Sequence, residues 1–290
     1  MTGYRAPGAF RKGGGSLIPV DFEYYRPESL AELSDALGDC AGRVAMLYGG
    51  GSEILSMARV GSIAPEAVID VKRSPECRGQ ALEGGRLFLG AALTLTEVAE
   101  GDCFPLLSTT VRRIADHTNQ CRITLGGNVC GTVIYREAVL PLLLADASVV
   151  LWSEGAMREE PLSEAFDRRL KRGTRELVVG FSVPEASLRL PYVHAKKTRG
   201  GKIDYPLVTV AMQCAPEGLR LAVSGACEFP YRERRSALND REIPAAERAR
   251  VLALNLPAAP LDDAIAHADY RQLQLEDTIR AGIERLEAEN

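Results

Sequence analysis

The chain has 290 residues, of which 46% are apolar and 26% charged, and this length and composition predict a globular protein of two or three compact units. Its formal net charge of −4 argues against binding to nucleic acid or to anionic membranes. The first residues lack the apolar stretch of a secretory signal, and no apolar run approaches the roughly twenty residues that cross a bilayer, so we expect a cytoplasmic protein without a membrane span.

Residues 20–72 are predicted to form a small α/β lobe, and residues 1–19 before them a flexible tail. The tail is rich in glycine and has little apolar surface to bury in a core. Apolar spacing and glycine boundaries predict two helices and two buried strands in the lobe. In chain order these elements are a helix at 27–37, a strand at 44–48, a helix at 53–59 and a strand at 67–71.

Residues 73–184 are predicted to form a second lobe, in which helices follow a first strand. The segment 124–128 is predicted to be a tight glycine turn, and the apolar run after it a buried helix. The expected strands lie at 86–92, 148–152 and 176–183, and the expected helices at 94–100, 104–115 and 137–146.

Residues 185–290 are predicted to form a third unit of the α+β class. It opens with a basic segment, residues 196–202, which fits a solvated loop as well as it fits an anion site. The expected strands lie at 205–214 and 219–224, and the expected helices at 245–253, 261–266 and 270–286.

Cysteine and histidine are not arranged as metal ligands. The seven cysteines are scattered without a CxxC pair, which predicts reduced thiols that act as small buried side chains. The three histidines, His117, His194 and His267, lie far apart and form no HExxH pattern, and no GxSxG sequence occurs. We therefore expect no metal site, and neither a metallohydrolase nor a serine hydrolase.

Two glycine turns are the strongest functional signal. Gly49-Gly50-Gly51 leaves a predicted strand and is followed by the hydroxyl of Ser52, and Gly126-Gly127 follows the hydroxyl of Thr124. Backbone N–H groups in such turns approach a phosphate closely because no Cβ intervenes. Neither turn has the spacing of a Rossmann fingerprint or of a P-loop. A dinucleotide could lie between the two turns, although each taken alone also fits a plain connection.

Further residues accompany the two turns in a recognisable order. They are Phe22, Tyr25-Arg26-Pro27 and Ser29-Leu30 in front, Pro65 and Val68-Ile69-Asp70 between, and Gly90-Ala91 before the second turn. With them, residues 20–290 resemble the FAD-binding subunits of molybdenum hydroxylases, the flavoprotein family of xanthine dehydrogenase and carbon monoxide dehydrogenase. The resemblance implies the two-lobed FAD-binding fold of p-cresol methylhydroxylase and vanillyl-alcohol oxidase, with a C-terminal α+β domain.

The resemblance also implies the residues that hold FAD. The first pyrophosphate loop is formed by Leu47, Tyr48, Gly49, Gly50, Gly51, Ser52, Glu53 and Ile54. The second is formed by Thr124, Gly126, Gly127 and Asn128, although Gln120-Cys121-Arg122 stands two residues closer to Thr124 than the matching family run does. Glu137 replaces an aspartate that touches FAD in the family, and Lys196 is placed to reach the flavin. No catalytic acid or base is expected on the chain.

The implied function is electron transfer within a multi-subunit molybdenum hydroxylase. A large subunit would carry molybdopterin and hydroxylate xanthine, another purine or another N-heterocycle. A small subunit with [2Fe–2S] clusters would pass electrons to the FAD of this chain, and NAD or another acceptor would receive them. Two alternatives stay open at this point: a stand-alone FAD oxidoreductase of the same fold, and an assembly protein that has lost FAD.

Overall fold

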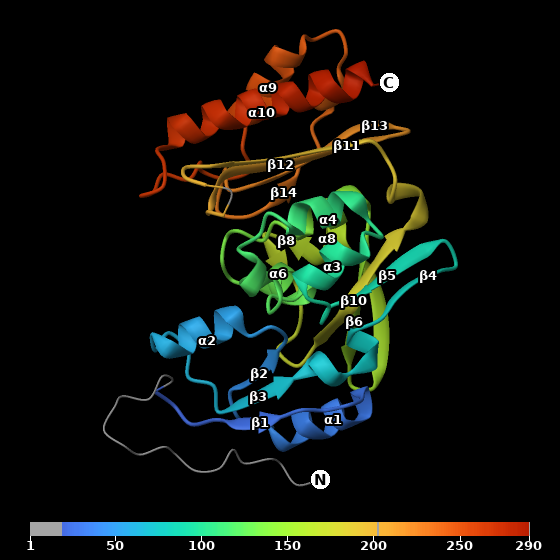
Figure 1. Ribbon diagram of the computed structural model, residues 1–290, viewed down its shortest axis with the longest axis vertical. Helices are drawn as coiled ribbons and strands as arrows, with labels where there is room; N and C mark the ends of the chain where they lie inside the picture. The colour runs from blue at the N-terminus through green and yellow to red at the C-terminus, as the bar shows by residue number, and fades with distance from the viewer. Residues whose placement is uncertain (1–18, 202, 290) are drawn as a thin grey trace.

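The computed structural model of the protein describes residues 19–201 and 203–289. Three sheets follow one another along the long axis of the molecule, and the chain runs from the first at one end to the third at the other (Figure 1). Nearly all of the expected N-terminal tail, residues 1–19, lies outside the described residues. No helix in the described part of the chain is both long enough and apolar enough to cross a membrane.

The first sheet has three parallel strands in the order β1-β3-β2. Helix α1 begins after Ser29, whose hydroxyl accepts a hydrogen bond from the N–H of Glu32 at 3.2 Å, and its buried face is formed by Leu33 and Ala36. The elements are β1 (Glu23–Tyr25), α1 (Leu30–Asp39), β2 (Ala45–Tyr48), α2 (Ser52–Arg59) and β3 (Ala67–Asp70), followed by short 3₁₀ turns at Val71–Arg73 and Pro75–Cys77.

The middle sheet is antiparallel, with the order β4-β5-β10-β6-β7, and short helices cover it. Its strands are β4 (Gln80–Glu83), β5 (Arg86–Gly90), β6 (Ser148–Ser153), β7 (Ala156–Pro161) and β10 (Leu177–Pro184). Its helices are α3 (Leu95–Gly101), α4 (Pro105–Val111), α5 (His117–Gln120), α6 (Leu125–Cys130), α7 (Val139–Leu144) and α8 (Leu162–Ala165). A two-stranded ribbon, β8 (Phe166–Asp167) with β9 (Arg169–Leu170), precedes β10.

The last sheet is an antiparallel meander, and one of its faces is covered by two helices (Figure 1). Helix α10 packs on β12 through Leu275, Ile279 and Ile283, all fully buried. The elements are β11 (Tyr192–Thr198), β12 (Pro206–Ala215), β13 (Gly218–Ser224), β14 (Tyr231–Arg232), α9 (Ala245–Leu254) and α10 (Ala268–Ala288), with 3₁₀ turns at Glu185–Ser187 and Ser236–Asn239.

The first two sheets share a hydrophobic core. Leu33 and Ile69 from the first sheet and its helix pack in one cluster with Trp152, Leu177 and Val179 from β6 and β10 of the middle sheet. All five side chains are at most 4% exposed. The first sheet is therefore anchored on the second by buried apolar surface, which is the main stabilising contribution in folding.

The structure corrects two of the expected elements. Residues 124–128 do not form a tight turn, because Thr124 caps the helix α6 and both glycines lie in its first turn. The helix expected at 261–266 is wrong. There the Asp263 carboxylate accepts hydrogen bonds from the N–H groups of Ile265 and Ala266, at 2.8 and 3.1 Å, and this local turn replaces helical hydrogen bonds.

Candidate functional site

The first glycine loop joins β2 to α2 and leaves backbone donors free. Gly51 is the residue before the helix, has a left-handed φ of 71° and provides no side-chain cap. Within the described residues, no acceptor lies opposite the N–H groups of Gly50, Gly51, Ser52 and Glu53. Free N–H groups at the positive end of a helix form an anion site, so this loop fits a phosphate.

The second glycine loop uses its donors internally. The N–H of Gly127 donates to the Thr124 hydroxyl at 3.1 Å, and the N–H of Gly126 donates to the Ala91 carbonyl at 2.8 Å. The N–H groups of Leu125 and Asn128 are also bonded within the fold. The two loops are therefore not equivalent cradles: the first offers amide donors, and the second offers a closely packed surface.

The glycines of both loops lie in close contacts, and those of the first loop touch the second loop. A Cβ on Gly49 would lie 2.7 Å from the hydroxyl oxygen of Thr124, and a Cβ on Gly50 would lie 1.8 Å from the carbonyl oxygen of Arg122. A Cβ on Gly126 would lie 2.6 Å from the Cβ of Ala91. Glycine is required at positions 49 and 50 because the first loop meets the second there, and at position 126 because the second loop packs on Ala91 of its own lobe.

Glu53 joins the helices that follow the two loops. Its carboxylate accepts two hydrogen bonds from the N–H of Thr132, at 2.8 and 3.1 Å, and a third from the Thr132 hydroxyl. A Cβ on Gly131 would lie 2.7 Å from the same carboxylate. Glu53 thus binds the segment after α6, and its expected role in FAD binding stays a prediction.

A polar cluster beside the first loop was not predicted. The ammonium group of Lys72 donates to the Gly49 carbonyl at 2.8 Å and to Asp70 at 2.7 Å, and it lies 4.4 Å from the centre of the Tyr48 ring. Tyr24 donates to the same carboxylate of Asp70. Burial, together with this hydrogen bond, raises the pKa of Tyr24 to about 12. Asp70 at the end of a buried strand was the available sequence signal.

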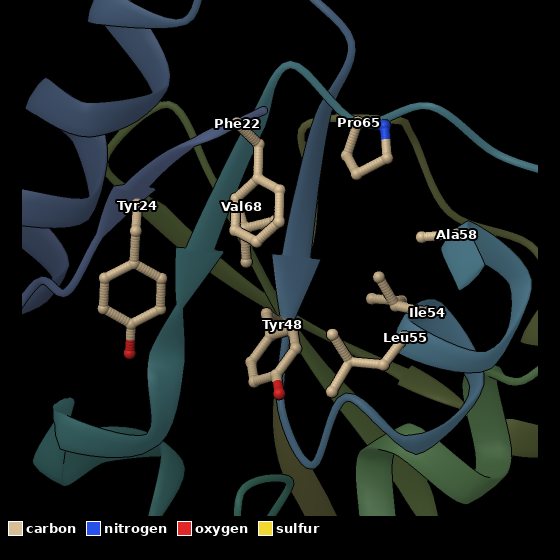
Figure 2. Close-up of a pocket in the computed structure, with 8 residues that line it drawn as sticks. All are labelled: Phe22, Tyr24, Tyr48, Ile54, Leu55, Ala58, Pro65 and Val68. Carbon is tan, nitrogen blue, oxygen red and sulfur yellow. The ribbon is translucent and has the colours of Figure 1, made fainter. Parts of the chain in front are cut away.

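A small apolar hollow of about 80 Å³ lies between the first sheet and α2 (Figure 2). Its lining includes Phe22 and Val68 from the sheet side and Leu55 from α2. Tyr48 and Ile54 of the first glycine loop line the same hollow. Because its walls are almost entirely apolar, the hollow cannot hold a phosphate, and the anion site is confined to the loop itself.

Glu137 and Lys196 form a buried ion pair between the middle sheet's helices and the last sheet. The Lys196 ammonium lies 3.0 Å from one carboxylate oxygen, and the hydroxyl of Thr209 donates to the other at 2.6 Å. The two charged side chains are only 3% and 2% exposed. Burial raises the pKa of Glu137, and the charge of Lys196 acts against that shift.

This ion pair is connected to the second glycine loop. The side-chain oxygen of Asn128 accepts a hydrogen bond from the N–H of Ala138, the residue after Glu137, at 3.1 Å. Lys196 also donates to the Arg113 carbonyl at 2.8 Å. The structure thus brings Asn128, Glu137 and Lys196 together, but Glu137 and Lys196 direct their charged atoms at each other. Contact of either with a flavin stays a prediction.

His194 next to this pair should make stability depend on pH. Burial, with the charges of Arg113 and Lys196, lowers its pKa from 6.5 to about 4. Between these values the unfolded chain takes up a proton and the folded chain does not, so the free energy of unfolding falls as pH is lowered from 6.5 to 4, by on the order of 3 kcal/mol.

In His194→Gln, we expect this decrease in the free energy of unfolding to be absent when chemical denaturation is measured across pH 4–7. His267→Gln is the matched control, because the side chain of His267 is 90% exposed. If the free energy of unfolding depended on pH equally in wild type and His194→Gln, His194 would not be the source of the effect.

Metal ligands are not gathered anywhere in residues 19–201 or 203–289: no three side chains of histidine, cysteine, aspartate or glutamate lie close enough to hold an ion. The candidate site is therefore the pair of glycine loops with the polar groups around them. Its geometry suits the binding of an anionic group at the first loop, where that loop lies against the second.

Comparison with known proteins identifies a family for this chain. Residues 20–186, more than half of the chain, match the family described as the FAD binding domain in molybdopterin dehydrogenase. The carbon monoxide dehydrogenase medium chain of Hydrogenophaga pseudoflava is 34% identical over 39% of this chain and 40% of its own length. The caffeine dehydrogenase subunit beta of Pseudomonas sp. (strain CBB1) is 28% identical over 58% and 59%. The chain thus spans about half the length of these relatives.

A solved structure shows the same fold over nearly the whole chain. Carbon monoxide dehydrogenase from Hydrogenophaga pseudoflava, in a form that lacks the Mo-pyranopterin moiety, superposes with a TM-score of 0.79 at 23% identity and covers 91% of this chain and 96% of its own. This match confirms the predicted fold class, with helices and strands in the expected FAD-binding arrangement. By the family match, the chain belongs to the FAD-binding domains of molybdopterin dehydrogenases.

Proposed function

We propose that the chain is the FAD-binding electron-transfer subunit of a multi-subunit molybdenum hydroxylase. The observation that carries this proposal is the row of free N–H groups from Gly50 to Glu53, which lies against the second loop from another lobe. A pyrophosphate needs such donors, and the glycines let it approach the backbone. The apolar hollow and the buried ion pair border the loops without filling them.

The residues proposed to hold FAD are those of the two loops with the polar groups beside them. Gly50, Gly51, Ser52 and Glu53 donate from the backbone to phosphate oxygens, and Thr124 and Gly127 form the opposing wall. Asn128, Glu137 and Lys196 lie further along, toward the last sheet. When bound, FAD supplies the redox chemistry, accepting electrons singly or in pairs. The protein positions it and sets its surroundings.

The partners and substrate follow from the family as proposals. A molybdopterin-binding large subunit would oxidise the substrate, and a small subunit with [2Fe–2S] clusters would relay electrons to FAD, which would pass them to NAD or another acceptor. The named relatives act on carbon monoxide and caffeine. Because caffeine is a purine, a purine or another N-heterocycle remains the proposed substrate class, with xanthine as one member.

A stand-alone oxidoreductase of the same fold is the alternative. It would need an acid or base that can reach a substrate beside the flavin. The charged groups between the second loop and the last sheet, Glu137 and Lys196, are buried and paired with each other. This pairing favours the electron-transfer role over the stand-alone enzyme.

Expression of the full chain alone tests the proposal. We expect a yellow protein with one FAD per chain, measured from its visible spectrum after release of the flavin. The complex isolated from the source organism should contain molybdenum and iron, measured by elemental analysis. A colourless chain that does not take up added FAD would rule out the electron-transfer role, and a yellow chain isolated without molybdenum would support the stand-alone enzyme.

A further inference from the structure

Arg122 is an exposed cation beside the first glycine loop. No hydrogen bond or ion pair joins its exposed guanidinium to any residue that the structure describes. Two other cationic side chains near the loops already have hydrogen-bond partners. Lys72 is bonded to Gly49 and Asp70, and the buried Arg136 donates to the carbonyls of Gly131 and Arg168. Arg122 is therefore available to a ligand without breaking an existing contact.

The position of Arg122 is fixed by the contact between the two loops. Its carbonyl oxygen lies 1.8 Å from the place that a Cβ on Gly50 would take, so its backbone rests directly on the first loop. Burial raises the pKa of Tyr48, and the positive charge of Arg122 acts against that rise. Gly50 and Tyr48 both belong to the loop with free N–H groups. The backbone of Arg122 thus lies against the loop with the free N–H groups, and its side chain is exposed beside that contact.

Two carboxylates lie beside the first loop, and one of them has no ion-pair partner among the described residues. The carboxylate of Asp70 is paired with Lys72, but among residues 19–201 and 203–289 that of Glu53 is bonded only to the N–H and hydroxyl of Thr132. A pyrophosphate bound at the N–H of Glu53 would bring two further negative charges to this place. Like charges at short range repel, and an arginine in hydrogen-bond reach offsets this because its planar fork fits phosphate oxygens.

We propose that Arg122 donates hydrogen bonds to the pyrophosphate of the dinucleotide and is its principal cationic partner on this chain. The inference rests on the proposed function and adds a residue to its site. It also assigns a specificity: Arg122 favours ligands that carry the ADP half, such as FAD, over flavins without a diphosphate.

The test is the affinity of the full-length apoprotein for FAD and for ADP. FAD binding is followed by the quenching of flavin fluorescence, and ADP by its competition with FAD. Arg122→Gln is expected to weaken both ligands by about tenfold or more, because a hydrogen bond to a charged group is lost. Arg122→Lys should recover part of the loss. Added salt should weaken FAD binding less in Arg122→Gln than in wild type.

Arg250→Gln is the matched control, because Arg250 is an exposed arginine on α9 without a described partner. It should bind both ligands as wild type does. Equal affinities in Arg122→Gln and Arg250→Gln would overturn the inference and leave the proposed function intact. A loss for FAD but not for ADP would also overturn it, because Arg122 would then act on the flavin half. If the wild-type chain bound no FAD, the proposed function itself would fail.

Discussion

Gly50→Ala is expected to abolish FAD binding, with at least a hundredfold loss of affinity. The added Cβ would lie 1.8 Å from the carbonyl oxygen of Arg122 and 2.7 Å from its carbonyl carbon. Both are backbone atoms of the other lobe, so the loops must move apart and the free N–H groups lose their position. Overpacking of this kind costs about 1–3 kcal/mol of stability. Fluorescence titration with FAD and chemical denaturation measure the two effects.

Two other glycines serve as controls for this prediction. Gly38 lies in α1 with no atom within 4 Å of an added Cβ, so Gly38→Ala should leave FAD binding unchanged and stabilise the protein by up to about 1 kcal/mol. Gly127→Ala should have an intermediate effect, since its Cβ would meet only the hydroxyl of Thr124, at 2.8 Å. Normal FAD affinity in Gly50→Ala would show that the contact between the loops is not needed for the site.

Lys196→Met should be the most destabilising of the variants considered. It leaves the carboxylate of Glu137 buried without its cation, and loss of one partner of a buried pair costs about 3–5 kcal/mol. The hydroxyl of Thr209 would remain as a hydrogen-bond donor to Glu137, but it carries no charge. Denaturant unfolding monitored by circular dichroism gives the change in the free energy of unfolding.

The double variant Glu137→Leu with Lys196→Met separates a structural role from cofactor binding. Removal of both charges avoids the buried unpaired carboxylate, so stability should recover most of the loss. Conversion of the neighbouring exposed Lys197 to methionine is the control for a change of charge alone. If Lys196→Met kept its stability but lost FAD, Lys196 would be a cofactor ligand and not an interdomain contact.

The local elements of the fold could be predicted because their signals lie within a few residues. Apolar runs gave the strands β2, β3 and β12, and apolar spacing gave α9 and α10. Strand β7 was missed because five of its six residues are exposed and polar residues dominate it, so it shows no apolar alternation. Strand β11 was also missed. Its last residues belong to the basic run 196–202, which fits a solvated loop, whereas the side chain of Lys196 is buried in an ion pair.

The glycine loops of the candidate site could be located from the sequence, but the roles of their residues could not. Whether an N–H group is free depends on carbonyls elsewhere, such as that of Ala91, which occupies the N–H of Gly126. Glu53 and Thr132 are 79 positions apart, and Glu137 and Lys196 are 59 apart. No local pattern encodes such pairs. Arg122 stood out in the sequence only as a departure from the family order.

Because the first two sheets share one hydrophobic core, they have to be exchanged together when chimeras of related proteins are made. A cut near residue 72 would leave Trp152, Leu177 and Val179 on one fragment and Ile69 on the other, each with bare apolar surface in water. Such fragments aggregate more readily than they fold. Chimeras that graft a new cofactor preference onto this chain should therefore transplant residues 20–184 as one piece, and join it to the recipient just before β11.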